Sequence, residues 1–258
     1  MWRALRIAIL LFILATVALG AWRESSRSQS WTRTLQVSLY PINADGSERT
    51  AAYLRQLTQR DFEVIERWFG HQARAHGVEL HEPIRVEWGT EITARPPAPP
   101  LHGNMFENML WSLNMRYWAW RHAEERRLQP DIRIYVQYYD PDQTTSVAHS
   151  IGLRKGLIGV AHLFATRHAH GSNTVILAHE LLHTLGASDK YDPASLQPVF
   201  PDGYAEPHLT PSVPQELAEI MGGRIPLSAT EAIVPGHLNH TLIGRATAGE
   251  IGWAARRE

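Results

Sequence analysis

Two histidines and a glutamate stand in the pattern H-E-x-x-H, formed here by His179, Glu180 and His183. On a helix, residues four apart lie one turn apart on the same face, so both imidazoles can bind one metal ion. Glu180 lies beside them, where it would face a water molecule on the ion as a general base and not as a ligand. The pattern therefore predicts a catalytic zinc centre, with Zn²⁺ as the cofactor.

A glycine and an aspartate follow the second histidine at informative distances. Gly186 stands where a helix that turns back sharply needs a residue that accepts a left-handed conformation. That turn would deliver Asp189 as the third protein ligand and leave a fourth position open, as in catalytic zinc sites. With 14 histidines in the chain, a chance H-E-x-x-H is roughly a one-in-twenty event. Requiring the glycine and a ligand at these positions lowers the chance to roughly three in ten thousand.

Other residues compete for the place of the third ligand, because some zinc proteases take a glutamate from a later helix. The rivals are Asp192, His208, Glu216 and Glu219. The histidines just upstream of the predicted zinc helix, His162, His168 and His170, are expected to have structural roles. Gly186 favours Asp189 over the rivals.

The stretch from His179 to Asp189 resembles the signature of the metzincin metallopeptidases, H-E-x-x-H-x-x-G-x-x-H, which a methionine turn follows downstream. Asp189 replaces the last histidine, as in the snapalysin-like branch of the family. The resemblance implies that Met221 is the methionine-turn residue, a hydrophobic floor beneath the zinc that does not bind it.

Some metzincins have a tyrosine two positions after that methionine, whereas this chain has Gly223. If a phenol stabilises the oxyanion, Tyr191 or Tyr204 would have to supply it. The family also binds its substrate antiparallel to an outer strand beside the zinc helix. The resemblance assigns this role to residues 146–153, with Ser146, Ile151, Gly152 and Leu153 as the substrate edge.

Apolar periodicity predicts the secondary structure. Alternating apolar residues predict strands at 34–40, 84–88 and 132–136, and a hairpin of 146–153 and 157–163. Apolar residues at helical spacing predict helices at 51–70, 104–127 and 239–253, and a short helical piece at 216–221. The zinc helix is expected to be capped by Ser172 or Asn173. The long helix at 104–127 is expected to pack through Phe106, Leu110, Leu113, Tyr117 and Trp118.

We predict an α+β fold with a mixed, about five-stranded twisted sheet, an active-site helix and a smaller C-terminal subdomain that holds the methionine turn. Residues 1–23 are expected to be an N-terminal membrane anchor or signal segment. Residues 24–258 are expected to form the metallopeptidase-like domain, with subdomains at about 31–186 and 187–258. A hydrophobic content of 44% with nine tryptophans is ample for its core.

Composition excludes several classes of protein. A formal net charge of −1 gives no electrostatic basis for binding nucleic acid. The absence of cysteine excludes disulfides, thiolate zinc ligands and a cysteine nucleophile.

Residues 7–22 form a nearly unbroken apolar run behind Arg3 and Arg6. The run predicts a single-pass membrane anchor with the catalytic domain outside the cytoplasm, in the periplasm if the source is bacterial. Cleavage of the run as a signal peptide would instead give a secreted protein.

These features predict a membrane-anchored zinc endopeptidase that hydrolyses peptide or protein substrates with a zinc-bound water activated by Glu180. The alternative is a catalytically silent, zinc-containing periplasmic binding or adaptor module. Such a module would keep His179, His183 and Asp189 but would have no use for Glu180, so we favour the enzyme.

Overall fold

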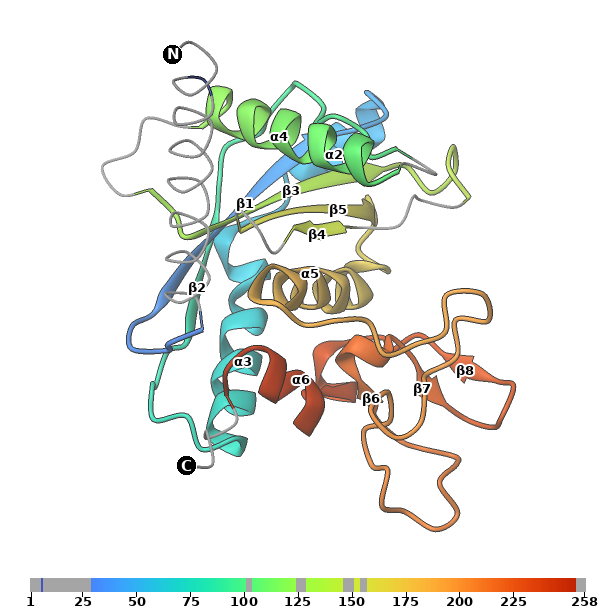
Figure 1. Ribbon diagram of the computed structural model, residues 1–258. Coiled ribbons are helices and arrows are strands. Elements are labelled where there is room, and N and C mark those ends of the chain that lie inside the picture. The colour runs from blue at the N-terminus through green and yellow to red at the C-terminus, as the bar shows by residue number, and fades with distance from the viewer. Residues whose placement is uncertain are drawn as a thin grey trace.

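The computed structural model describes residue 6 and residues 29–100, 104–123, 129–145, 151–153 and 157–253, with backbone alone at 151–153. A five-stranded sheet in the order β2-β1-β3-β5-β4 forms its centre (Figure 1). The strands are β1 (Leu35–Asn43), β2 (Ile84–Trp88), β3 (Ile132–Tyr139), β4 (Ile151–Leu153) and β5 (Ile158–Phe164). Neighbouring strands are parallel except for β4, which pairs antiparallel with β5 at the edge. The mixed sheet and its hairpin are confirmed.

The central strands are buried along almost their whole length because helices cover both faces of the sheet (Figure 1). The helices are α2 (Glu48–Leu54), α3 (Glu63–Ala75), α4 (Met105–Arg121), α5 (His170–Leu185) and α6 (Arg245–Glu250). Successive residues of β3 point to opposite faces. Thus Ile134 lies in the larger core with α3 and α5, and Tyr135 packs in a second core with Met115 of α4.

The predicted helix at 51–70 is in fact two helices, α2 and α3, with a 3-10 turn (Gln59–Asp61) between them. The cause is local. The backbone N–H and hydroxyl of Thr58 both donate to the Asp61 carboxylate, at 2.7 and 2.9 Å, which starts a new helical segment there.

Helix α5 begins at His170 and therefore earlier than its predicted caps. Its N-cap is Ala169, which makes no side-chain hydrogen bond. Ser172 donates instead to the Ala169 carbonyl, and Asn173 donates to the carbonyl of Phe164 at the end of β5. The capping prediction was wrong because tertiary contacts claim both polar side chains.

Residues after Gly186 pack on the side of α5 that faces away from the sheet (Figure 1). They form short pieces: β6 (Ala218–Glu219), a 3-10 turn (Ile220–Gly222), β7 (Ile225–Pro226), β8 (Ala232–Ile233), a 3-10 turn (Leu238–His240) and β9 (Thr241–Leu242) before α6. The helices predicted at 216–221 and 239–253 are confirmed only in part, as the 3-10 turn at Ile220–Gly222 and as α6. Ala218 pairs with Thr241 in a parallel ladder, which leaves only residues 245–250 for the last α-helix.

Of the five residues through which α4 was predicted to pack, only Trp118 contacts the core; the other four lie on the exposed side of the helix. Phe106, Leu110, Leu113 and Tyr117 are exposed, whereas Met115 and Ala119 are buried and the Trp118 ring lies edge-on, 4.8 Å from the ring of Tyr135. Both faces of this helix are apolar, so periodicity alone could not identify the face that meets the sheet.

Within the described part of the chain, every helix is too short or too polar to span a lipid bilayer. This finding contradicts the predicted transmembrane helix and the predicted single-pass membrane localisation. Residues 7–22, on which the prediction rested, lie outside the described residues.

Candidate metal centre

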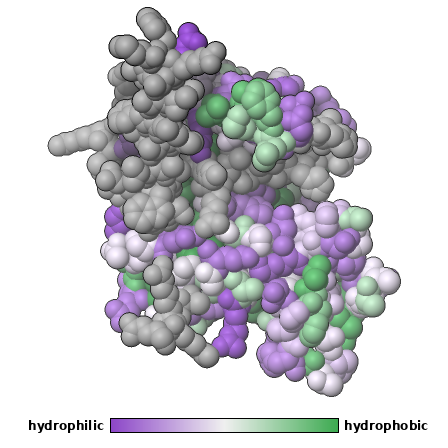
Figure 2. Space-filling model, viewed as in Figure 1, coloured by the Kyte–Doolittle hydropathy of each residue, from purple (hydrophilic) through white to green (hydrophobic). Residues whose placement is uncertain are grey.

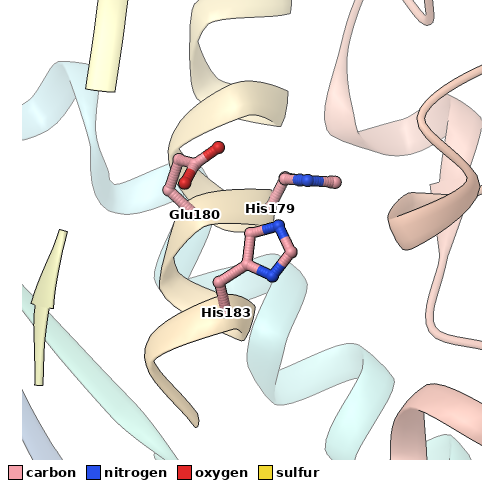
Figure 3. A group of neighbouring side chains, drawn as sticks. All are labelled: His179, Glu180 and His183. Carbon is pink, nitrogen blue, oxygen red and sulfur yellow. The ribbon is translucent and has the colours of Figure 1, made fainter. Parts of the chain in front are cut away.

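Helix α5 presents His179, Glu180 and His183 together, with the two imidazoles on adjoining turns (Figure 3). Their ring centroids lie 4.6 Å apart with the ring planes nearly perpendicular. Gly186 then ends the helix in a left-handed conformation with φ of 111°, as predicted, and its N–H donates to the carbonyl of His183. The glycine turn thus brings the following residues back beside the histidines.

Backbone carbonyls hold both imidazoles in one orientation. Nδ1 of His179 lies 2.9 Å from the carbonyl oxygen of Ile220, and Nδ1 of His183 lies 2.9 Å from that of Ala187. A carbonyl can only accept, so each neutral ring carries its proton on Nδ1 and offers the lone pair of Nε2 to the cleft. This arrangement around the imidazole is typical of histidines that bind a metal.

Asp189 lies where both free nitrogens converge. Its Oδ1 is 3.2 Å from Nε2 of His179 and 3.1 Å from Nε2 of His183. A tetrahedral zinc site with bonds of about 2.0–2.2 Å holds adjacent ligand atoms roughly 3.3–3.5 Å apart. Both distances lie within a few tenths of an ångström of that spacing, so Asp189 and each histidine are placed as ligands of one zinc ion would be.

Glu180 supplies a second carboxylate to the same place. The possible ligand atoms of His179, Glu180 and His183 all lie within 4.8 Å of one another, so this group could hold a metal ion. Glu180 is buried, and its Oε2 has no hydrogen-bond partner among the described residues. Burial raises its pKa, against the lowering effect of the two imidazoles. An unpaired buried oxygen is costly, which indicates a role in binding or proton transfer.

The charges of the centre favour a cation. Burial lowers the pKa of His179, but the hydrogen bond to Asp189 and the charge of Glu180 outweigh it and raise this pKa to about 9. Burial raises the pKa of Asp189, but its hydrogen bonds to the two imidazoles hold it well below its usual range. Asp189 is therefore ionised at neutral pH, and a proton and a metal ion compete for Nε2 of His179.

The four other candidates for the third metal ligand either bind other groups or lie outside the cleft at the metal centre. Asp192 accepts hydrogen bonds from the backbone of Ala194 and Ser195. Glu219, which is fully buried, accepts from the N–H groups of Gly222 and Gly244 and from the hydroxyl of Thr247. His208 and Glu216 are exposed and do not line the cleft at the centre.

Glu219 also shows how the segment around Met221 is fixed. Met221 is fully buried in the larger core, and its carbonyl accepts from the N–H of Lys190. The carboxylate of Glu219 ties the same turn to the start of α6 through Gly244. No sequence pattern predicted this network, because Glu219 and Gly244 are 25 residues apart and share no periodicity.

An open cleft of about 510 Å³ lies over the centre. Its walls come from α5, the end of β5, the loop after Asp189 and the segment after Met221; they include Phe164, Ile176, Leu196, Ile220, Arg224 and Val234. Tyr191 lines this cleft, and burial with the charges of Asp189 and Glu180 raises its pKa to about 12. Tyr204 packs its ring on Phe200 and is not among the lining residues.

Sequence reasoning missed two residues of the cleft, His162 and Arg224. His162 lies on β5, with its Nε2 3.1 Å from the side-chain amide of Gln137 on β3, a contact that fits its predicted structural role. In addition, His162 lines the cleft. His170, eight residues later, does have a structural role, with Nε2 3.2 Å from the carbonyl of Asp61. No motif marked either cleft residue.

The metzincin resemblance rests on the zinc motif. No protein-family model matches the chain, and no curated protein matches it. Membership of that family therefore stays a prediction, and the interpretation of the centre depends on its geometry.

The predicted substrate edge coincides in part with β4, which lies at the free edge of the sheet and packs beside α5. Gly152 of β4 is paired with Gly159 of β5. Ser146 lies outside the described residues.

Proposed function

We propose that the chain is a zinc-dependent endopeptidase, a hydrolase in which His179, His183 and Asp189 hold the ion. The observation that carries the proposal is the convergence of two oriented Nε2 atoms on Asp189, beside the unpaired carboxylate of Glu180, in an open cleft. When bound, zinc supplies Lewis-acid activation of a water molecule and of the substrate carbonyl.

Glu180 acts in this proposal as the general base and then as the general acid. Its carboxylate takes a proton from the attacking water and passes it to the amine that leaves when the peptide bond breaks. Burial, which raises its pKa, makes it a better proton acceptor than an exposed glutamate. A site that only stored zinc would gain nothing from a buried carboxylate without a hydrogen-bond partner.

Tyr191 supplies a neutral hydroxyl donor beside the centre. With a pKa of about 12, the phenol keeps its proton at neutral pH. A hydroxyl at the wall of the cleft can donate to the oxygen of the substrate carbonyl as negative charge develops on it. Tyr191 thus takes the place of the tyrosine that Gly223 replaces.

The substrate is proposed to bind as an extended peptide along β4. A strand at the edge of a sheet has unpaired N–H and C=O groups that can pair with another chain. Such main-chain pairing aligns a peptide without selecting its side chains, which suits an endopeptidase.

Replacing Gly152 with proline tests this edge. Gly152→Pro removes an N–H from β4 or distorts the strand, so KM for peptides should rise several-fold while the zinc content stays at the wild-type level. Steady-state kinetics on one peptide, with metal analysis of the same sample, measures both. Unchanged kinetics in a folded, zinc-loaded variant would remove β4 from the substrate site.

The proposed activity is tested by digesting a peptide library with the purified chain, with and without a chelator, and identifying the products by mass spectrometry. Cleavage at internal peptide bonds should stop with the chelator and return when zinc is added. If the zinc-loaded chain cleaved no peptide, the silent binding module would be the better explanation.

A further inference from the structure

Helix α4 exposes an apolar surface that no part of the described chain covers. Of the thirteen exposed large hydrophobic side chains among the described residues, seven belong to this one helix: Met105, Phe106, Met109, Leu110, Leu113, Tyr117 and Trp120. The hydrophobic colour gathers over α4 in the space-filling view, and the helix forms an outer layer of the molecule (Figures 1 and 2). We call these seven side chains the α4 face.

The area of the α4 face matches one side of a protein interface. Its side chains expose between 49% and 88% of their surfaces. At about 150–250 Å² for a large side chain, they present roughly 800 Å² in total. This exceeds the largest apolar patch of a typical monomer, about 300–600 Å², and equals what each partner buries in a standard interface.

The spacing on the α4 face is that of a helix that packs against another helix. Phe106, Leu113 and Trp120 are seven residues apart, and Leu110 and Tyr117 lie four residues after the first two. The resulting 4-3-4-3 spacing forms a continuous seam along one side of a helix. The opposite side, with Met115 and Ala119, is already buried against the sheet.

A row of polar residues lies beside this seam, with an acidic residue at one end and a basic residue at the other. In an antiparallel pair of helices, the acidic end of one row meets the basic end of the other. Glu107, Asn114 and Arg121 are seven residues apart and follow Phe106, Leu113 and Trp120 by one position. In an antiparallel pair of α4 helices, two-fold symmetry brings these rows together on the same side. Glu107 of one copy then faces Arg121 of the other at both ends, and the two Asn114 side chains meet at the centre.

We propose that the α4 face binds a second copy of this chain, as an antiparallel α4–α4 pair with its two-fold axis near Leu113 and Asn114. The pairing of Glu107 with Arg121 of the other copy favours the antiparallel orientation. In a parallel pair the two polar rows would lie on opposite sides of the seam and could not meet. Opposed helix dipoles add to the same preference. The dimer leaves the proposed zinc centre untouched. The interface lies on α4 and the zinc centre on α5, and these two helices lie on opposite faces of the sheet (Figure 1).

The absence of cysteine from the chain allows a direct test by cross-linking. In the purified full-length chain, Asn114→Cys treated with a short thiol-to-thiol cross-linker should give a covalent dimer. Arg121→Cys alone should give little, since two such positions would lie roughly 21 Å apart along an antiparallel pair. A mixture of Glu107→Cys and Arg121→Cys chains should recover the cross-link.

Sedimentation velocity on the same full-length chain supplies a second readout. Leu113→Glu should convert the dimer into a monomer and, in the Asn114→Cys background, abolish cross-linking. The control is Val199→Glu, at a residue of matched exposure, which should leave the dimer and the cross-linking unchanged. A monomeric wild-type chain would overturn the proposal, whether the α4 face then bound lipid vesicles or was covered by the chain's own residues 7–22. Equal cross-linking at positions 114 and 121 would overturn the antiparallel arrangement.

Discussion

Glu180→Gln is expected to lower kcat/KM for peptide hydrolysis by roughly 10²–10⁴-fold while leaving zinc bound. Glutamine has nearly the same shape, so it fits the buried position of Glu180 next to His179 and His183. Its amide cannot accept the proton that the proposed reaction removes from water. Chemistry and metal binding should therefore separate, as measured by peptide kinetics and by the zinc content of the same preparation.

Glu216→Gln is the matched control, because Glu216 is exposed and does not line the cleft. It should retain wild-type activity. His183→Ala gives the opposite reference, with loss of both zinc and hydrolysis. If Glu180→Gln lost zinc as fully as His183→Ala, Glu180 would be a ligand, and the base would have to be another residue.

Asp189→Ala is expected to weaken zinc affinity by roughly 100-fold or more, because Oδ1 of Asp189 lies within 3.2 Å of both free histidine nitrogens. Asp189→His should keep most of the affinity, since imidazole is a common zinc ligand in the same position of a tetrahedral site. Competition with a chelator of known affinity measures each variant.

Asp192→Ala provides the control for the aspartate three positions earlier. Asp192 is also a loop carboxylate, but it accepts hydrogen bonds from the backbone of Ala194 and Ser195 and is fully exposed. Its removal should leave zinc affinity unchanged. Equal affinity in the wild type and Asp189→Ala would move the third ligand to Glu180, the other carboxylate beside the imidazoles.

The histidine pair was predictable from sequence because it depends on one local element. Residues four apart meet on any helix, and Gly186 marks the point where the chain leaves that helix. The hydrogen-bond partners of the imidazoles could not be predicted from the sequence. The carbonyl of Ile220 reaches Nδ1 of His179 from 41 residues away, and a backbone group leaves no trace in the sequence.

The same distinction applies to the fold. Strands with alternating or continuous apolar residues were located well, as β2 at Ile84–Trp88 shows. The errors fell where tertiary contacts override local pattern. Thr241 and Leu242 pair with β6 in a two-stranded ladder instead of forming a helix. Phe106 and Leu113 face solvent on a helix with two apolar sides.

A zinc titration of the metal-free chain would test the proposed centre most directly. Peptide hydrolysis should rise in proportion to added zinc up to one equivalent and then stay constant, because His179, His183 and Asp189 form a single site. The Glu180→Gln chain should bind the same single equivalent and stay inactive. Binding of one zinc ion by the wild type without any hydrolysis would contradict a catalytic centre here.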